Sequence, residues 1–220
     1  MRDRFTYEIT LLKQRLQQLA SSSRNALVEA SNALQTMDTA RAQGIIENDM
    51  CIDAEEVAIE EECLKLIALY QPVAKDLRLI ITILKINTEL ERVADLSANI
   101  ARSVISLSAH HCAIPNTMDL TTMAKQTDAM LKGALEAFIC HHPEQARAII
   151  QEDDVIDNLN HKHYDFAQHL LESQCPEMCS ALDTIAISYA LERIADSATN
   201  ICEDIIYLNE GVIVRHCPQL

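Results

Sequence analysis

Hydrophobic residues recur at helical spacing along most of the chain. Within residues 74–108, apolar and small side chains follow an i, i+3, i+4 order, which places them on one face of a helix. The residues on that face are Leu77, Ile80, Ile81, Leu84, Thr88, Ala94, Ala98, Ala101 and Ile105. We expect this face to be buried in the core.

Four prolines stand between the periodic segments rather than inside them, namely Pro72, Pro115, Pro143 and Pro176. Together with the periodicity they predict six helices, at about residues 4–36, 38–70, 74–108, 117–140, 143–172 and 177–209. Long helices joined by short connections are typical of antiparallel bundles.

An internal repeat divides the chain into two halves. Residues 87–107 and 188–208 align without gaps, sharing Leu-Glu-Arg, then Ala-Asp, then Asn-Ile. Upstream, Asp49-Met-Cys-Ile-Asp53 matches Asp153-Asp-Val-Ile-Asp157. We therefore predict an all-α fold, a tandem duplication of a three-helix bundle. Its parts would be a first bundle at 1–108, a linker at 109–116, a second bundle at 117–211 and a tail at 212–220.

The amino-acid composition agrees with an all-α fold and limits the kinds of molecule that the protein is expected to bind. Only 4% of residues are aromatic, and 3 glycines and 5 prolines supply too few turns for a β-rich chain. The net charge of −15 repels a polyanion, so we expect no nucleic-acid binding and look instead to cations or basic protein surfaces. The sequence has neither an apolar run of membrane-spanning length nor a signal peptide, which predicts a cytoplasmic protein without a membrane span.

Each half carries two pairs of acids four residues apart, a spacing that puts both carboxylates on one face of a helix. The pairs are Asp49/Asp53 and Glu91/Asp95 in the first half, and Asp153/Asp157 and Glu192/Asp196 in the second. Single pairs arise by chance in so acidic a chain, but pairs on two successive helices that recur in register do not. If those helices are neighbours, the acids form two clusters of four.

Clusters of carboxylates without imidazole or thiolate ligands suit hard cations. We take iron as the first candidate, with zinc, manganese, magnesium or calcium as alternatives. Arg92 and Arg193 follow the cluster glutamates by one residue, about 100° round the helix, so we do not expect them to complete the same site. They are candidates for an ion pair with another helix or for binding a partner. Asn99 and Asn200 are expected to make buried hydrogen bonds between helices.

Other metal-like motifs do not repeat between the halves. We interpret His110-His111-Cys112, His141-His142 and His161-Lys-His163 as solvated histidines rather than ligands. Cys175-Pro-Glu-Met-Cys179 has the residues of a zinc or redox site but no second cysteine pair beside it. The sequence has no glycine-rich phosphate loop, HExxH or GxSxG, so we predict a protein that is not an enzyme.

Three segments carry a resemblance to a known protein family. Two are the duplicated Leu-Glu-Arg-Val-Ala-Asp and Leu-Glu-Arg-Ile-Ala-Asp, each followed by Asn-Ile. The third is Cys63-Leu-Lys-Leu-Ile-Ala-Leu-Tyr-Gln-Pro-Val-Ala-Lys-Asp-Leu-Arg78. From about residue 4 to 211 the sequence resembles the PhoU family of accessory regulators of phosphate transport. The resemblance implies two three-helix bundles with metal bound by the acid pairs. The sequence departs from the family's usual Glu-Arg-Ile-Gly-Asp motif, because Ala94 and Ala195 stand at the glycine position.

The resemblance further implies a negative regulator of phosphate-starvation signalling, which contacts the phosphate transporter ATPase subunit and the phosphate-sensing histidine kinase. It also allows a homodimer and a peripheral position at the inner face of the membrane. Two alternatives stay open from the residues. One is a ferritin-like di-iron or metal-handling protein, although the Glu-x-x-His motif is absent, and the other is a helical scaffold whose acids are merely solvated.

Overall fold

The computed structural model describes residues 2–111, 114, 118–173 and 178–214. Within these residues it consists of helices without strands, which confirms the predicted all-α class. The helices are α1 (Arg2–Thr36), α2 (Thr39–Tyr70), α3 (Ala74–Ala109), α4 (Leu120–Cys140), α5 (Pro143–Ser173) and α6 (Met178–Glu210). Part of the predicted linker and of the tail, together with Cys112 and the Cys175-to-Cys179 side chains, lies outside the described residues.

Local sequence sets several helix ends. The carboxylate of Asp38 caps α2 by accepting from the backbone N–H of Arg41 at 3.0 Å. Asp119 caps α4 in the same way, accepting from Thr122 at 3.0 Å, so α4 begins at Leu120 and not at residue 117 as the periodicity suggested. At the end of α2, Gln71 adopts a left-handed conformation with φ of 47°, and Pro72 prevents continuation.

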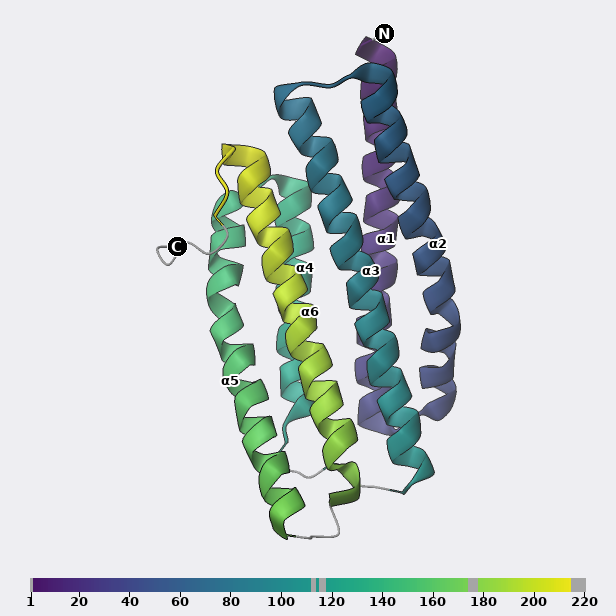
Figure 1. Ribbon diagram of the computed structural model, residues 1–220, viewed down its shortest axis with the longest axis vertical. Helices are drawn as coiled ribbons and strands as arrows, with labels where there is room; N and C mark the ends of the chain where they lie inside the picture. The colour runs from purple at the N-terminus through teal and green to yellow at the C-terminus, as the bar shows by residue number, and fades with distance from the viewer. Residues whose placement is uncertain (1, 112–113, 115–117, 174–177, 215–220) are drawn as a thin grey trace.

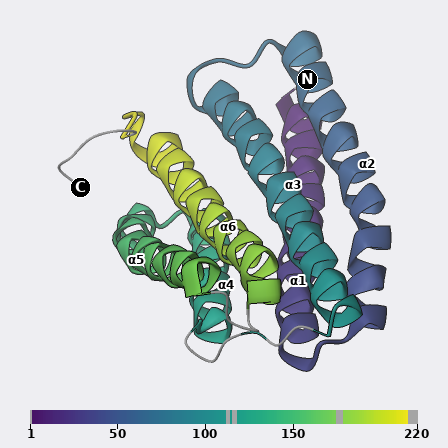
Figure 2. The same ribbon diagram turned by 60° about the horizontal axis from the view of Figure 1, so that its bottom comes forward.

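The six helices form two three-helix bundles that lie side by side (Figure 1). Within each bundle every helix packs on the other two. Between the bundles, α3 packs on α6 and α1 packs on α4. In the described part of the chain, α2 and α5 touch no helix of the other bundle, and Figure 2 shows them at opposite edges. The internal repeat therefore appears in space as two equivalent halves.

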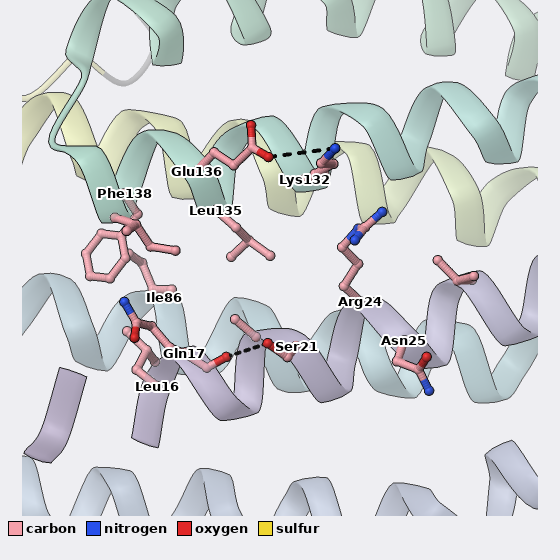
Figure 3. A pocket seen from close by; sticks show the side chains of 13 residues that line it. Leu16, Gln17, Ser21, Arg24, Asn25, Ile86, Lys132, Leu135, Glu136 and Phe138 are labelled. Atoms are coloured by element: carbon pink, nitrogen blue, oxygen red, sulfur yellow. Dashed lines mark hydrogen bonds and ion pairs between the residues drawn. The ribbon is translucent and has the colours of Figure 1, made fainter. Parts of the chain in front are cut away.

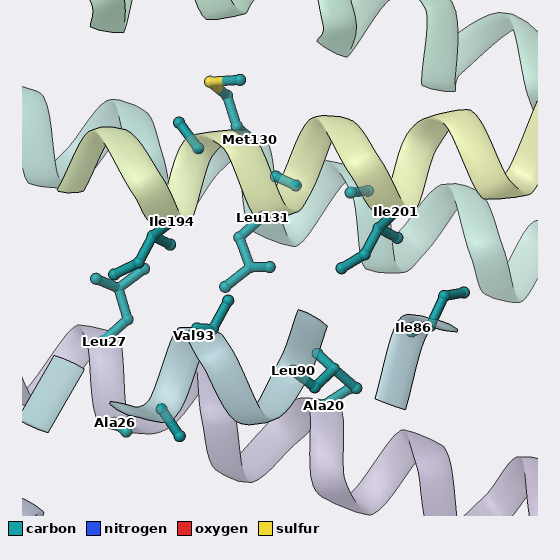
Figure 4. Packing of buried hydrophobic residues seen from close by; sticks show 14 of the residues in the cluster. Ala20, Ala26, Leu27, Ile86, Leu90, Val93, Met130, Leu131, Ile194 and Ile201 are labelled. Atoms are coloured by element: carbon teal, nitrogen blue, oxygen red, sulfur yellow. The ribbon is translucent and has the colours of Figure 1, made fainter. Parts of the chain in front are cut away.

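One main aliphatic core runs through both bundles, with buried apolar residues from all six helices, and a smaller cluster of Met118, Ala167 and Ala181 lies apart from it. Figure 4 shows Leu27 of α1, Leu131 of α4 and Ile194 of α6 pointing toward one another. Leu90 and Val93 of α3 are fully buried beside them. Leucine, isoleucine and alanine fill most of this interior, in a chain whose aromatic content is only 4%. No helix in the described segments combines the length and apolarity that crossing a membrane demands.

Candidate functional site

The first acid cluster lies where α2 packs on α3. Asp49 and Asp53 stand one helical turn apart on α2, and Glu91 and Asp95 stand likewise on α3. Burial, and then the charges of Asp53 and Asp95, raise the pKa of Asp49. Burial and the same two neighbours also raise the pKa of Glu91. The four carboxylates therefore act on one another across the two helices, as the spacing predicted they would if these helices were neighbours.

Two side chains of α3, one cationic and one neutral, interact with the acids of this cluster. The Arg102 guanidinium lies 3.9 Å from Asp49 Oδ2, and Asn99 Nδ2 donates to Asp95 Oδ2 at 3.3 Å. Arg102 also donates to Asn99 Oδ1 at 2.5 Å. Asn99 is thus exposed and bonded within its own helix, so the expectation of a buried bond between helices is wrong for this residue. Its side chain instead orders the edge of the cluster.

The second cluster lies where α5 packs on α6, and the pKa values of two of its acids are raised further than those of the first cluster. Burial, then Asp157 and Asp196, raise the pKa of Asp153 to about 7. Burial, then Asp196 and Asp157, raise the pKa of Glu192 to about 7 as well. The pKa of Asp196 is raised chiefly by burial. Carboxyl groups held together in this way favour either a proton or a cation between them.

Two buried oxygens test whether the clusters fit a metal ion. Asp49 Oδ1 in the first cluster and Glu192 Oε2 in the second have no hydrogen-bond partner among the described residues. An oxygen in this position lacks the compensation that buried polar atoms normally have, and a hard cation would supply it. As the side chains are placed, no group of three or more His, Cys, Asp and Glu in the described segments can hold a metal ion. Binding of a metal ion would therefore require the four acids of a cluster to move closer together.

The two motif arginines occupy different surroundings despite their equivalent positions. Arg92 of α3 lowers the pKa of Glu192 and of Asp196, so its charge faces the cluster of the other bundle across the α3·α6 contact. Arg193 of α6 donates to the Tyr189 hydroxyl at 2.6 Å, and its guanidinium lies 5.5 Å from that ring. Its Nε is 3.8 Å from Asp196 Oδ2. Of these two arginines, Arg92 is therefore the one whose charge acts on the other half.

A polar seam between α3 and α6 was not foreseen from the sequence. Lys85 Nζ lies 2.7 Å from Asp204 Oδ1, although Asp204 is only 2% exposed. Asn200 Nδ2 donates to Glu89 Oε1 at 3.1 Å, so the expected hydrogen bond between helices is present, although it is only partly buried. Burial raises the pKa of Glu89. A sequence signal did exist, since charged residues interrupt the apolar face of α3, but it did not identify their partners.

The histidine motifs divide between surface and interior. His110, His111, His141, His142 and His161 are exposed, in line with solvated histidines. His163 departs from that interpretation because it is buried in the second bundle. Its Nδ1 lies 2.9 Å from Ser188 Oγ, which in turn donates to Asn160 Oδ1 at 2.9 Å. His163 therefore belongs to a polar network of the core.

A cavity of about 620 Å³ opens between α1 and α4, with Ile86 of α3 at its side (Figure 3). Its walls are largely apolar, including Leu16, Leu135 and Phe138. Arg24 at the rim makes two hydrogen bonds to Asp128, at 2.7 and 2.9 Å, and Lys132 pairs with Glu136 at 3.8 Å. Because acids of the same chain already engage both cations, the cavity is a gap between bundles and lacks the convergent polar groups of a ligand site.

Comparison with known proteins gives the same division into halves. The family model described as "PhoU domain" matches twice, at residues 16–104 and 120–205. A "Phosphate-specific transport system accessory protein PhoU homolog 1" from Thermotoga maritima is 34% identical over 207 residues, which cover 94% of this chain and 89% of that protein.

Two solved structures resemble this one over nearly the whole chain. The crystal structure of PhoU from Pseudomonas aeruginosa matches with a TM-score of 0.90 and 31% identity, covering 94% of this chain and 100% of that one. The phosphate transport system regulatory protein PhoU from Streptococcus pneumoniae matches with a TM-score of 0.87 and 32% identity, covering 96% and 99%. The arrangement of the six helices is therefore shared with solved proteins.

Proposed function

The chain belongs to the PhoU family, and we propose that it is a non-enzymatic accessory regulator of phosphate transport that represses the phosphate-starvation response when phosphate is plentiful. The match of the PhoU domain to both halves is the observation that carries this proposal. The names of the relatives support it, because they describe accessory and regulatory proteins of phosphate transport. The absence of nucleophile, phosphate-loop and metalloprotease motifs from the sequence also favours a role in binding rather than catalysis.

In this proposal the protein acts in the cytoplasm as an adaptor. Its partners are the ATPase subunit of the phosphate transporter and the phosphate-sensing histidine kinase. A net charge of −15 suits docking to basic surfaces, where charge complementarity speeds encounter and makes binding sensitive to salt. Loss of either contact would uncouple transport from gene expression.

The two acid clusters are part of the same proposal as sites for metal ions, iron first. Asp49 and Asp53 of α2 would hold an ion together with Glu91 and Asp95 of α3. The second site would use the corresponding acids of α5 and α6, namely Asp153, Asp157, Glu192 and Asp196. The ion would supply positive charge that offsets the crowded carboxylates and joins the two helices of each pair.

Deletion of the gene in its own host tests the regulatory role. In phosphate-rich medium, the deletion strain should express its phosphate-uptake genes, and a plasmid copy should restore repression. Repression that persists in a strain with no second family member contradicts the regulatory proposal. A metal-handling function, the ferritin-like alternative, would then be examined by oxygen consumption with ferrous iron.

Elemental analysis tests the metal sites separately. We expect the double variant Asp95→Ala with Asp196→Ala to bind less metal than the unaltered protein. The matched control is Glu60→Ala with Asp165→Ala, which removes two exposed acids of α2 and α5 outside the clusters. Because an ion bound only to the folded state stabilises it, chelation should lower the melting temperature of the control but not of the double variant. Equal metal content in both variants rejects the assignment.

A further inference from the structure

The outer face of α2 carries an exposed apolar stripe. Met50, Val57 and Leu64 follow one another at seven-residue intervals and are 73%, 51% and 55% exposed. Ala54 and Ala68 lie on the same line and are also exposed. Seven residues bring a helix back to nearly the same side, with a drift of about 20°, so these five side chains lie along one line of the helix, which Glu61 interrupts between Val57 and Leu64. We call them the α2 stripe.

The position of α2 leaves this stripe uncovered. Among the described residues, α2 packs only on α1 and α3, at one edge of the molecule (Figure 2). The core face of α2 is a different set of residues, including Ile52, Ile59 and Leu66, all of which are buried. The stripe therefore adds nothing to the core of the bundle, and large exposed apolar side chains in a line are typical of a surface that binds another protein.

The second half of the chain provides an internal comparison, because α5 occupies the equivalent edge. When Asp49 and Asp53 are aligned with Asp153 and Asp157, the stripe residues Met50, Ala54, Val57, Leu64 and Ala68 fall opposite Asp154, Asn158, His161, Gln168 and Glu172. All five of these α5 residues are exposed and polar. Among the described side chains of α5, the large exposed apolar ones are Val155 and Tyr164, which lie nine residues apart and so point to opposite sides of the helix. The bundle itself therefore does not require an apolar stripe.

Charge around the stripe indicates what covers it. Glu61 lies on the line of the stripe and Glu47 and Glu60 lie beside it, all three exposed. Lys65, a cation near the stripe, is 2.9 Å from Glu62. A second copy of the chain is a poor occupant. Parallel pairing would place each acid against itself, and antiparallel pairing centred on Val57 would bring Glu61 to Asp53. A helix with basic flanks would meet the acids favourably.

We propose that the α2 stripe is the docking site for an amphipathic helix of a partner protein, with apolar residues at heptad spacing and lysine or arginine at the flanking positions. The two helices would pair with the shallow left-handed crossing that seven-residue spacing favours. This proposal rests on the proposed adaptor function only in assuming that a partner protein exists. The docking surface itself is inferred from the exposure, the spacing and the surrounding charge of the stripe residues.

A synthetic peptide serves as the probe. It carries leucine at the a and d positions of four heptads and lysine at e and g, and its binding to the full chain is followed by fluorescence anisotropy. The test variant Met50→Asp/Val57→His/Leu64→Gln gives α2 the residues of α5 at these positions. We expect it to weaken binding by about 100-fold, because apolar anchors at the centre of an interface carry most of its affinity. Circular dichroism verifies that the variant folds.

Controls separate this surface from general attraction to an acidic protein. The variant Val155→Asp/Tyr164→Gln removes exposed apolar side chains from α5 and should bind as tightly as the unaltered chain. A peptide with glutamate at e and g should bind at least about 10-fold more weakly than the lysine peptide, and added salt should narrow that difference. Equal binding of the lysine peptide to the stripe variant and the unaltered chain overturns the proposal.

Sedimentation velocity tests the competing occupant. If the unaltered chain forms dimers that the stripe variant does not, the stripe binds a second copy and the proposal is wrong. A monomeric chain that binds the lysine peptide through the stripe supports it. Neither result depends on gene expression, so the docking proposal can fail while the regulatory function stands, or survive if that function is rejected.

Discussion

Burial of His163 predicts that acid destabilises the second bundle through this one side chain. His163 is 3% exposed, and its Nδ1 lies 2.9 Å from Ser188 Oγ. Burial lowers the pKa of His163 below its ordinary 6.5, and the nearby charge of Asp119 offsets only part of that effect. The folded protein thus holds the imidazole neutral at a pH where the unfolded chain has already bound a proton.

The direction and size of the effect follow from proton linkage. Between the folded and the unfolded pKa, the unfolded state binds one more proton, so the free energy of unfolding falls by about 1.4 kcal/mol for each pH unit of acidification. Taking the unfolded pKa as 6.5, proton linkage limits the stability that His163 loses by about pH 5.5 to at most about 1.4 kcal/mol. Above the unfolded pKa the contribution is fully present.

The variant His163→Asn removes the titrating group while keeping a donor toward Ser188. Urea unfolding followed by circular dichroism at about pH 7.5 and about pH 5.5 gives the pH dependence of stability for each protein. We expect His163→Asn to be less stable at both values, but the unaltered chain to lose more stability on acidification than the variant does, by at most about 1.4 kcal/mol. The matched control is His169→Gln, an exposed histidine of the same helix, which should keep the original pH dependence.

The two variants and the unaltered chain must be compared with one another, because protonation of other groups changes the free energy of unfolding in the opposite direction. The pKa of Asp153 and that of Glu192 are each raised to about 7, so the folded state binds protons there before the unfolded chain does, and acid stabilises it. Those contributions are common to all three proteins and cancel in the difference. If His163→Asn and the unaltered chain respond equally to pH, the argument from burial is refuted.

Three further sets of substitutions test the fold. Gln71→Gly should raise the free energy of unfolding by about 0.5–1 kcal/mol, because φ of 47° suits glycine, whereas Gln43→Gly inside α2 should lower it by about 1 kcal/mol. Thermal melting compares the two, and a loss of stability in Gln71→Gly contradicts the left-handed cap. Ala94→Gly and Ala195→Gly should each lower the free energy of unfolding by about 1–2 kcal/mol in urea titrations, since both methyl groups are buried in helix interiors. Leu90→Ala, at the centre of the shared core, should lower it by about 3–4 kcal/mol, and a change below about 1 kcal/mol would show that the site is not closely packed.

The sequence by itself determined the helices, their order and the duplication. Spacing of 3.6 residues and the prolines between segments are local properties, and each helix here forms where they predict it, apart from the shift of α4 to Leu120 by the Asp119 cap. The acid pairs could also be found this way, because i, i+4 spacing fixes which side chains share a helical face. Whether the helices that carry them are neighbours stayed a condition, which the α2·α3 and α5·α6 contacts meet.

Only the tertiary structure decided which side chains meet across the two bundles. Lys85 and Asp204 are 119 residues apart, and their pairing depends on how α3 and α6 are rotated and shifted against each other. Periodicity defines the buried face of a helix but not its height along a neighbour, so it could not place Arg92 opposite the second cluster or His163 beside Ser188. It also could not show that α2 and α5, equivalent in sequence order, both lie at uncovered edges. Packing of the whole core fixes these relations, because side-chain volumes from all six helices must fit together at once.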